Sequence, residues 1–148
     1  TCGMLLKGRA MYSVQQIQRV IDHYTKGICP VKAEDFVRVS EKTGVAIDLM
    51  LAQGIQESRL GTLGRGARTH NIYNVGNVDS GANREMNDWV NGMLVYGRLM
   101  AQFYGKTAEE VLARGFRRTD NGCRYATDPN YVNAIRRLVT AVRKRLAE

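Results

Sequence analysis

Residues 46–61 read AIDLMLAQGIQESRLG. The apolar side chains of this stretch recur at helical spacing, as at Ile47 and Leu51, and this pattern predicts a helix over residues 46–58 with one side in the core. Near the end of this helix the chain carries a single carboxyl group, that of Glu57. This position makes Glu57 the first candidate for a functional side chain.

Two further helices are expected before this stretch. Ser13 has the context of an N-cap, and apolar residues follow it at helical spacing until Gly27 interrupts the pattern. Residues 32–43 repeat the helical pattern, and Gly44 is well placed as the left-handed residue that ends the second helix. The first part of the chain is therefore predicted to be helical.

Further helices are expected in the second half of the chain. Asn87 or Asp88 can cap a helix that runs to Gly105, and its stripe of aromatic and methionine side chains is assigned to the core. Residues 107–110 have the pattern of a capping box that opens a short helix. The pair Asp128-Pro129 predicts the start of a last helix, with a cap followed by a proline in the first turn.

The central segment has a different character. Residues 61–87 are rich in Gly, Asn and Arg, and their apolar residues follow no regular period. This composition predicts a loop with at most a short irregular hairpin. Because long connections inside compact domains are usually functional, we expect this loop to form one wall of a cleft beside Glu57.

Length and composition fit one domain that spans residues 1–148. The 148 residues suffice for a proper core. No apolar run approaches the ~20 residues that a membrane span needs. A count of 22 Lys and Arg against 14 Asp and Glu gives a net charge of +8, which favours anionic partners such as nucleic acid, anionic lipid or cell-wall polymers. No residue pattern calls for a cofactor or a metal.

The cysteines form an odd set, Cys2, Cys29 and Cys123. They have neither the close spacing of a zinc site nor the even number of a full disulfide framework. A bridge between Cys29 and Cys123 is compatible with work outside the cytoplasm, and two free thiols are the alternative.

The expected surroundings of Glu57 suit a proton donor. Its side chain projects at the edge of the apolar arc of its helix, and Gly54 clears space one turn earlier. Burial disfavours the charged carboxylate, and the negative end of the helix dipole acts in the same direction, so both raise the pKa of Glu57. By position alone, the alternative is a solvated glutamate on an ordinary amphipathic helix.

Three segments resemble a known family. Residues 52–61, AQGIQESRLG, resemble the AQ-x-x-x-ES-x-x-G segment of the glucosaminidase-type peptidoglycan hydrolases, glycoside hydrolase family 73. Residues 71–76, NIYNVG, resemble the N-L-F-G-I segment that follows. Residues 125–131, YATDPNY, are close to the family's G-Y-A-T-D-P-x-Y, although Arg124 stands in place of its first Gly. The resemblance covers about residues 33–146 and leaves residues 1–30 as an N-terminal helical extension.

This resemblance implies a mainly α, lysozyme-like domain with a Gly/Asn-rich loop or small β-hairpin lobe. It implies that Glu57 is the general acid and that Tyr125 lines the cleft, where an aromatic ring offers a flat face to a sugar. The alternative for Tyr125 is an anchor that packs its loop under the last helix. The resemblance also implies that the 71–76 segment shapes the sugar subsites, with these substrate-binding candidates: Asn71, Tyr73, Asn74 and Gly76.

A second carboxylate is less clearly indicated. An inverting enzyme needs a base across the cleft, and Asp79, Glu85 and Asp88 are the acids in or beside the central loop. Asp79 is the first choice because glycines bracket it, whereas Asp88 suits a helix cap. The alternatives are attack by the acetamido group of the substrate, or ring closure by an internal hydroxyl as in lytic transglycosylases.

The predicted function is cleavage of the β-1,4 bond between N-acetylglucosamine and N-acetylmuramic acid, by a monomer that works outside the cytoplasm. Its partners are then peptidoglycan strands and anionic cell-wall polymer, without nucleic acid. A rival interpretation takes residues 36–51 as part of a DNA-binding helix-turn-helix. Its recognition helix would begin with apolar residues, which suit phosphates and base edges poorly. A wall-binding module without catalysis is a further alternative.

Overall fold

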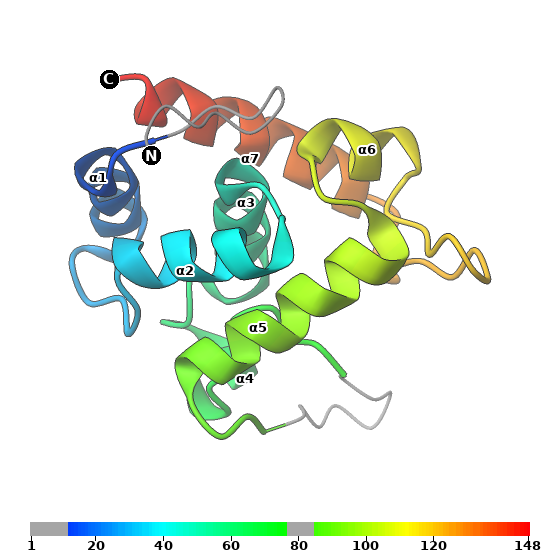
Figure 1. Ribbon diagram of the computed structural model, residues 1–148, viewed down its shortest axis with the longest axis horizontal. Coiled ribbons are helices and arrows are strands. Elements are labelled where there is room, and N and C mark those ends of the chain that lie inside the picture. The colour runs from blue at the N-terminus through cyan, green and yellow to red at the C-terminus, as the bar shows by residue number, and fades with distance from the viewer. Residues whose placement is uncertain (1–11, 77–84) are drawn as a thin grey trace.

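A computed structural model describes residues 12–76 and 85–148 of the chain (Figure 1). The helices are α1 (Val14–Thr25), α2 (Ala33–Thr43), α3 (Ile47–Ser58), α4 (Gly64–Arg68), α5 (Trp89–Leu99), α6 (Ala108–Ala113) and α7 (Tyr131–Leu146), and a π-helical turn, η1 (Met100–Tyr104), continues α5. Within these described ranges the strand-like pairing is limited to an isolated bridge between Arg117 and Arg124. The predicted mainly α class is confirmed.

The first helices begin and end where local chemistry predicts. The Ser13 hydroxyl accepts a hydrogen bond from the Gln16 backbone N–H at 3.0 Å, and the Gln16 side chain accepts one from the Ser13 N–H at 2.7 Å. This reciprocal capping box satisfies N–H groups that the first turn leaves without a helical partner. Gly44 ends α2 with φ of 81°, a left-handed conformation that costs glycine little.

The later helices follow the prediction except at one boundary. Asp88 caps α5 by accepting a hydrogen bond from the Asn91 N–H at 2.7 Å. Asp128 was expected to cap α7, but its carboxylate instead accepts a hydrogen bond from the Asn130 N–H at 2.8 Å, which closes a turn. The prediction of a start at Asp128-Pro129 is therefore wrong, and α7 begins at Tyr131.

The described part of the central segment contains no hairpin. Residues 61–76 form the short helix α4 followed by turns, and residue 85 leads directly toward the cap of α5. The expected loop is therefore found in the described residues, except that residues 64–68 form a short helix which the sequence did not predict. The candidate base Asp79 lies outside the residues that the structure describes.

Helix α3 lies at the centre of the fold. It packs against α2, α4 and α7, and Figure 1 shows it enclosed between α2 and α7. Residues 48–54 are all buried, so most sides of the helix face other parts of the protein. A recognition helix must enter a DNA groove, and this burial prevents α3 from doing so. The helix-turn-helix interpretation is therefore wrong.

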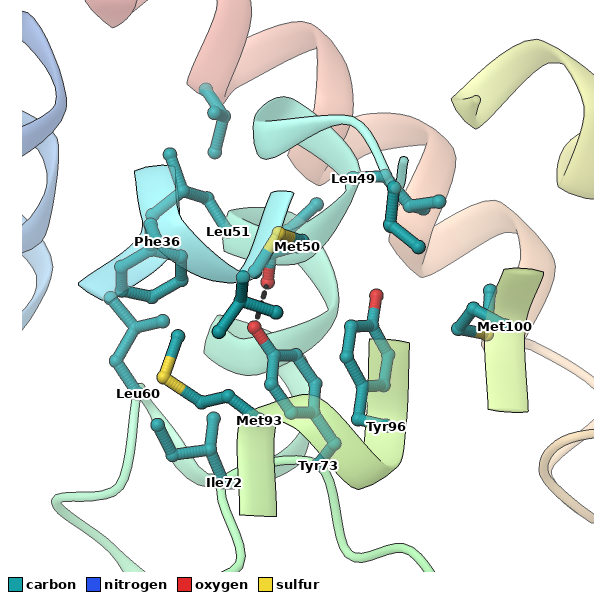
Figure 2. Packing of buried hydrophobic residues seen from close by; sticks show 14 of the residues in the cluster. Phe36, Leu49, Met50, Leu51, Leu60, Ile72, Tyr73, Met93, Tyr96 and Met100 are labelled. Carbon is teal, nitrogen blue, oxygen red and sulfur yellow. Dashed lines mark hydrogen bonds between the residues drawn. The ribbon is translucent and has the colours of Figure 1, made fainter. Parts of the chain in front are cut away.

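Aromatic rings cover α3 on the side of the central segment. The rings of Tyr73 and Tyr96 stack with their centroids 3.5 Å apart, and Figure 2 shows them side by side below α3. The Tyr73 hydroxyl donates a hydrogen bond of 2.9 Å to the Met50 carbonyl oxygen. Two large side chains thereby enter the core without leaving a buried hydroxyl unsatisfied.

A partly buried ion pair aligns α7 with α3. The guanidinium of Arg143 lies 2.7 Å from the carboxylate of Asp48, which is only 9% exposed, and 2.8 Å from that of Glu109. Arg143 lies late in α7 and Asp48 early in α3, so the two helices run antiparallel. This direction brings the start of α7 to the end of α3, where Glu57 lies.

The two described cysteines are not paired with each other. Cys29 and Cys123 are free thiols, and the Cys29 thiol donates a hydrogen bond of 3.3 Å to the Leu60 carbonyl oxygen. The bridge that the sequence left open is therefore not formed in this structure. In the described part of the chain, none of the helices combines the length and apolar character that crossing a bilayer requires.

The close contact between α2 and α5 depends on the absence of a side chain at Gly97. A Cβ atom at Gly97 would lie 2.7 Å from Cγ2 and 2.9 Å from Oγ1 of Thr43. Thr43 is short, β-branched and buried, so it has little freedom to move away. We expect Gly97→Ala to lower the free energy of unfolding by about 1–2 kcal/mol, because overpacking outweighs the gain in helix propensity.

Chemical denaturation measures this difference. Arg98→Ala, at the next and exposed position of α5, is the matched control and should change the free energy of unfolding by less than about 0.5 kcal/mol. An unchanged or increased stability of Gly97→Ala would contradict the close approach of α2 and α5.

Candidate active site

Glu57 lies in the last turn of α3, at the edge of the core. The helix ends immediately after it, because Arg59 and Leu60 adopt left-handed conformations with φ of 47° and 55°. The Leu60 N–H then bonds back to the Gly54 carbonyl oxygen at 2.9 Å, which closes the helix end. The Glu57 side chain is half-buried, so it is partly dry and still reachable from solvent.

Ser58 ties this helix end to the central segment. Its hydroxyl donates a hydrogen bond of 2.7 Å to the Ile72 carbonyl oxygen and accepts one of 2.8 Å from the Gly61 N–H. The Ser58 side chain is buried, so these hydrogen bonds are shielded from water. They fix the turn at residues 71–75 beside Glu57.

Asn71 and Asn74 build this turn in different ways. The Asn71 side chain donates to the Val75 carbonyl oxygen at 2.9 Å and accepts from the Val75 N–H at 3.1 Å, which closes the turn. Asn74 has φ of 53°, a conformation that asparagine tolerates better than most residues. Its Nδ2 donates to the Glu57 backbone oxygen at 2.9 Å and to the Glu57 carboxylate at 3.0 Å.

A second donor reaches Glu57 from α7. The Tyr131 hydroxyl hydrogen-bonds to the Glu57 carboxylate and accepts a hydrogen bond of 3.2 Å from the Gln53 side-chain amide. The Gln53 amide oxygen in turn accepts a hydrogen bond of 2.5 Å from the Tyr96 hydroxyl. The hydrogen bonds of this buried chain therefore run in one direction, from Tyr96 through Gln53 and Tyr131 to Glu57.

These surroundings set the pKa of Glu57. Burial raises the pKa above its usual value of 4.5, because the carboxylate loses hydration. The hydrogen bonds from Asn74 and Tyr131 act in the opposite direction, since they stabilise the anion, and the net result is a raised pKa. A carboxyl group of this kind holds its proton closer to neutral pH and can act as a general acid.

Tyr125 packs against Tyr131 and so lies near the Glu57 carboxyl group. Its ring stacks on that of Tyr131 with centroids 5.8 Å apart and planes 18° apart, and its hydroxyl donates a hydrogen bond of 2.9 Å to the Tyr73 carbonyl oxygen. Tyr125 is half-buried, as are Glu57 and Asn74. The stacking and the hydroxyl bond anchor the loop beside Tyr131, which in turn contacts Glu57.

Other residues predicted to bind sugar have a different placement. Asn71 and Tyr73 are fully buried, and their side chains donate hydrogen bonds to the backbone oxygens of Val75 and Met50. They therefore shape the turn and cannot contact a substrate in this structure. Gly76 is exposed, and it is the last residue of the first described range, 12–76. Asn74 is the predicted residue that the fold brings directly to Glu57.

Tyr131 and Gln53 are not among the residues that the sequence predicted for the site. Both are buried, and both belong to the hydrogen-bonded chain that ends on Glu57. A signal for Gln53 was present, since it lies four residues before Glu57 and therefore on the same side of the helix. In the described residues no cluster of His, Cys, Asp and Glu could hold a metal ion.

Comparison with known proteins identifies the family. A family model for glucosaminidases, described as mannosyl-glycoprotein endo-beta-N-acetylglucosaminidase, matches residues 33–144. A comparison with curated proteins found no match. The matched residues include Glu57, Asn74 and Tyr131 and leave α1 outside. The chain therefore belongs to the glucosaminidase family and is a glycoside hydrolase of the endo-β-N-acetylglucosaminidase type that cleaves peptidoglycan.

Proposed function

We propose that the protein cleaves the β-1,4 bond between N-acetylglucosamine and N-acetylmuramic acid, with Glu57 as the general acid. The observation that carries this proposal is a half-buried carboxyl group with a raised pKa and two hydrogen-bond donors, Asn74 and Tyr131. Cleavage of a glycosidic bond needs such an acid, because the leaving oxygen must gain a proton as positive charge develops at the anomeric carbon.

The two donors also have a role after the proton leaves. Transfer from Glu57 to the leaving oxygen creates a carboxylate, which the Asn74 amide and the Tyr131 hydroxyl already face. Donors held in place before the reaction stabilise developing charge without reorganising. Burial keeps the proton on Glu57 before the reaction, and the donors limit the cost of losing it.

The partner that accepts the sugar is a separate question. Asp79 is our proposed base for activating water, and it lies outside the described residues. Among the described residues, the groups that shift the pKa of Glu57 include no other carboxylate. Attack by the acetamido group of the substrate, or closure of an anhydro ring, are the routes that need no second acid.

The nature of the substrate also bears on where the protein works. Peptidoglycan surrounds the cell outside the cytoplasmic membrane, so we propose that the protein works there. We also propose that it acts as a monomer.

The role of Glu57 is tested by Glu57→Gln. We expect loss of peptidoglycan hydrolysis by at least about 10²–10⁴-fold, because the amide keeps the size of the side chain and cannot donate a proton productively. Release of soluble fragments from purified cell walls measures the rate, with Glu41→Gln on the exposed side of α2 as the matched control. A residual rate within a few fold of the unchanged protein would exclude Glu57 as the acid.

Analysis of the products tests the bond and the acceptor. We expect mass spectrometry of digested peptidoglycan to find N-acetylglucosamine at the new reducing ends. Anhydro-sugar ends would instead indicate transglycosylation, and new reducing ends of N-acetylmuramic acid would contradict the proposed bond.

The contribution of Tyr131 is tested by Tyr131→Phe. The Tyr131 hydroxyl lowers the pKa of Glu57, so its removal should raise this pKa and move the loss of Glu57 protonation to higher pH. An NMR titration of the Glu57 carboxyl carbon measures the shift. Tyr125→Phe removes a hydroxyl that bonds to the Tyr73 carbonyl oxygen, and should change the pKa of Glu57 less. A lowered pKa in Tyr131→Phe would contradict the hydrogen bond.

Stability should also depend on pH through Glu57. A carboxyl whose pKa is raised on folding favours the folded state below its unfolded pKa of about 4.5, and this contribution is lost as pH rises through the folded pKa. Glu57→Gln should therefore match the unchanged protein near pH 4 and exceed its melting temperature at neutral pH. A variant that is less stable at neutral pH than at pH 4, relative to the unchanged protein, would contradict the direction of this pKa shift.

A further inference from the structure

A pocket of about 660 Å³ opens between α1, α3 and α7. Ile55, Gln56 and Arg59 line it from the end of α3, whereas Glu57 points to the other side of that helix, toward Asn74. The pocket is therefore separate from the site around Glu57, although both lie at the end of α3. Helix α7 packs against both α1 and α3, and Figure 1 shows both of them below it.

The charges around this pocket are of one sign. Its lining includes three cations, Lys26, Arg59 and Arg137, beside the imidazole of His23, and it includes no Asp or Glu. Lys26, Arg59 and Arg137 are exposed, and none of them forms a salt bridge within residues 12–76 and 85–148. Cations that converge on a concave surface without a counter-charge create a positive field that favours an anionic ligand.

The pocket also has an apolar component. The ring of Tyr24 and the side chains of Ile55 and Leu138 contribute to its lining. Tyr24 comes from α1, as does His23, and α1 lies outside the residues that match the family. The N-terminal helix thus supplies part of a binding surface that residues 33–144 cannot form alone.

We propose that this pocket binds the phosphate groups of a polyol-phosphate chain carried by the cell wall. Phosphodiesters keep their charge at all relevant pH values, and guanidinium groups such as that of Arg137 bind phosphate oxygens through paired hydrogen bonds. The apolar side chains of the pocket suit the carbon atoms between successive phosphates. A pocket of this volume accepts a flexible single chain and does not admit a double helix.

This inference deepens the proposed function and rests on it for the source of the ligand. An enzyme held on wall polymer through a second site experiences a high effective concentration of the glycan strands beside that polymer. Because the pocket and Glu57 lie on different sides of α3, the polymer and the glycan can be bound at the same time.

Calorimetric titration of the full chain with poly(glycerol phosphate) of defined length tests the site. The double variant Lys26→Gln, Arg137→Gln removes two pocket charges, and the double variant Lys42→Gln, Arg136→Gln removes two exposed charges elsewhere. Arg136 and Arg137 are neighbours on α7, so the variants have the same net charge and differ in position. We expect the pocket variant to weaken Kd by about tenfold or more and the control by less than about threefold.

Equal losses in the two double variants would show that only net charge matters and would overturn the inference. Unchanged melting temperatures are expected for both, because all four side chains are exposed. Polyglutamate and single-stranded oligonucleotide of matched charge are titrated in parallel. If either binds as tightly as poly(glycerol phosphate) and loses affinity equally in the pocket variant, the assignment to polyol phosphate is wrong.

Activity separates this inference from the proposed function. The pocket variant should cleave soluble, undecorated glycan strands at the unchanged rate, and Glu57→Gln should bind poly(glycerol phosphate) normally while being inactive. Full activity of Glu57→Gln would overturn the proposed function and leave the binding result intact. Normal polymer binding by the pocket variant would overturn this inference alone.

Discussion

Helix α3 is buried at the centre of the fold, and other helices are positioned by packing against it. Residues 48–54 face protein on nearly all sides, because α2, α4 and α7 pack around the helix. The last turn of α3 reaches the edge of this core, so Glu57 lies in surroundings that are dry enough to raise its pKa and open enough to be reached. The same helix end exposes Arg59 on its other side, next to the basic pocket.

Hydrogen bonds from buried polar groups partly offset the effect of burial on the pKa of Glu57. A carboxyl group in an apolar surrounding alone would hold its proton too strongly, and the hydrogen bonds from Asn74 and Tyr131 oppose that effect. The Tyr131 hydroxyl is itself oriented by Gln53, whose amide oxygen is occupied by the Tyr96 hydroxyl. Each member of the chain has a partner, which is the condition under which a buried polar network is stable and rigid.

Long-range contacts hold these groups in register. The Ser58 hydroxyl bonds to the Ile72 carbonyl oxygen and so fixes the turn that carries Asn74. At the other end of α3, the ion pair between Asp48 and Arg143 aligns α7 antiparallel to α3. Tyr131 then meets Glu57 because α7 begins where α3 ends. The geometry of the site thus depends on contacts at both ends of one buried helix.

The resemblance of residues 52–61 to the family motif pointed to Glu57 as the acid. Most of the helices follow from the sequence alone, because hydrophobic periodicity and capping act over a few residues. The Ser13 capping box, the left-handed Gly44 and the position of Glu57 all follow from such local rules. In contrast, the packing of distant segments places Tyr73 in the core and brings Tyr131 to the carboxyl group. The physical reason is that a side chain's burial and hydrogen-bond partners depend on how distant segments pack, and no short stretch of sequence encodes that.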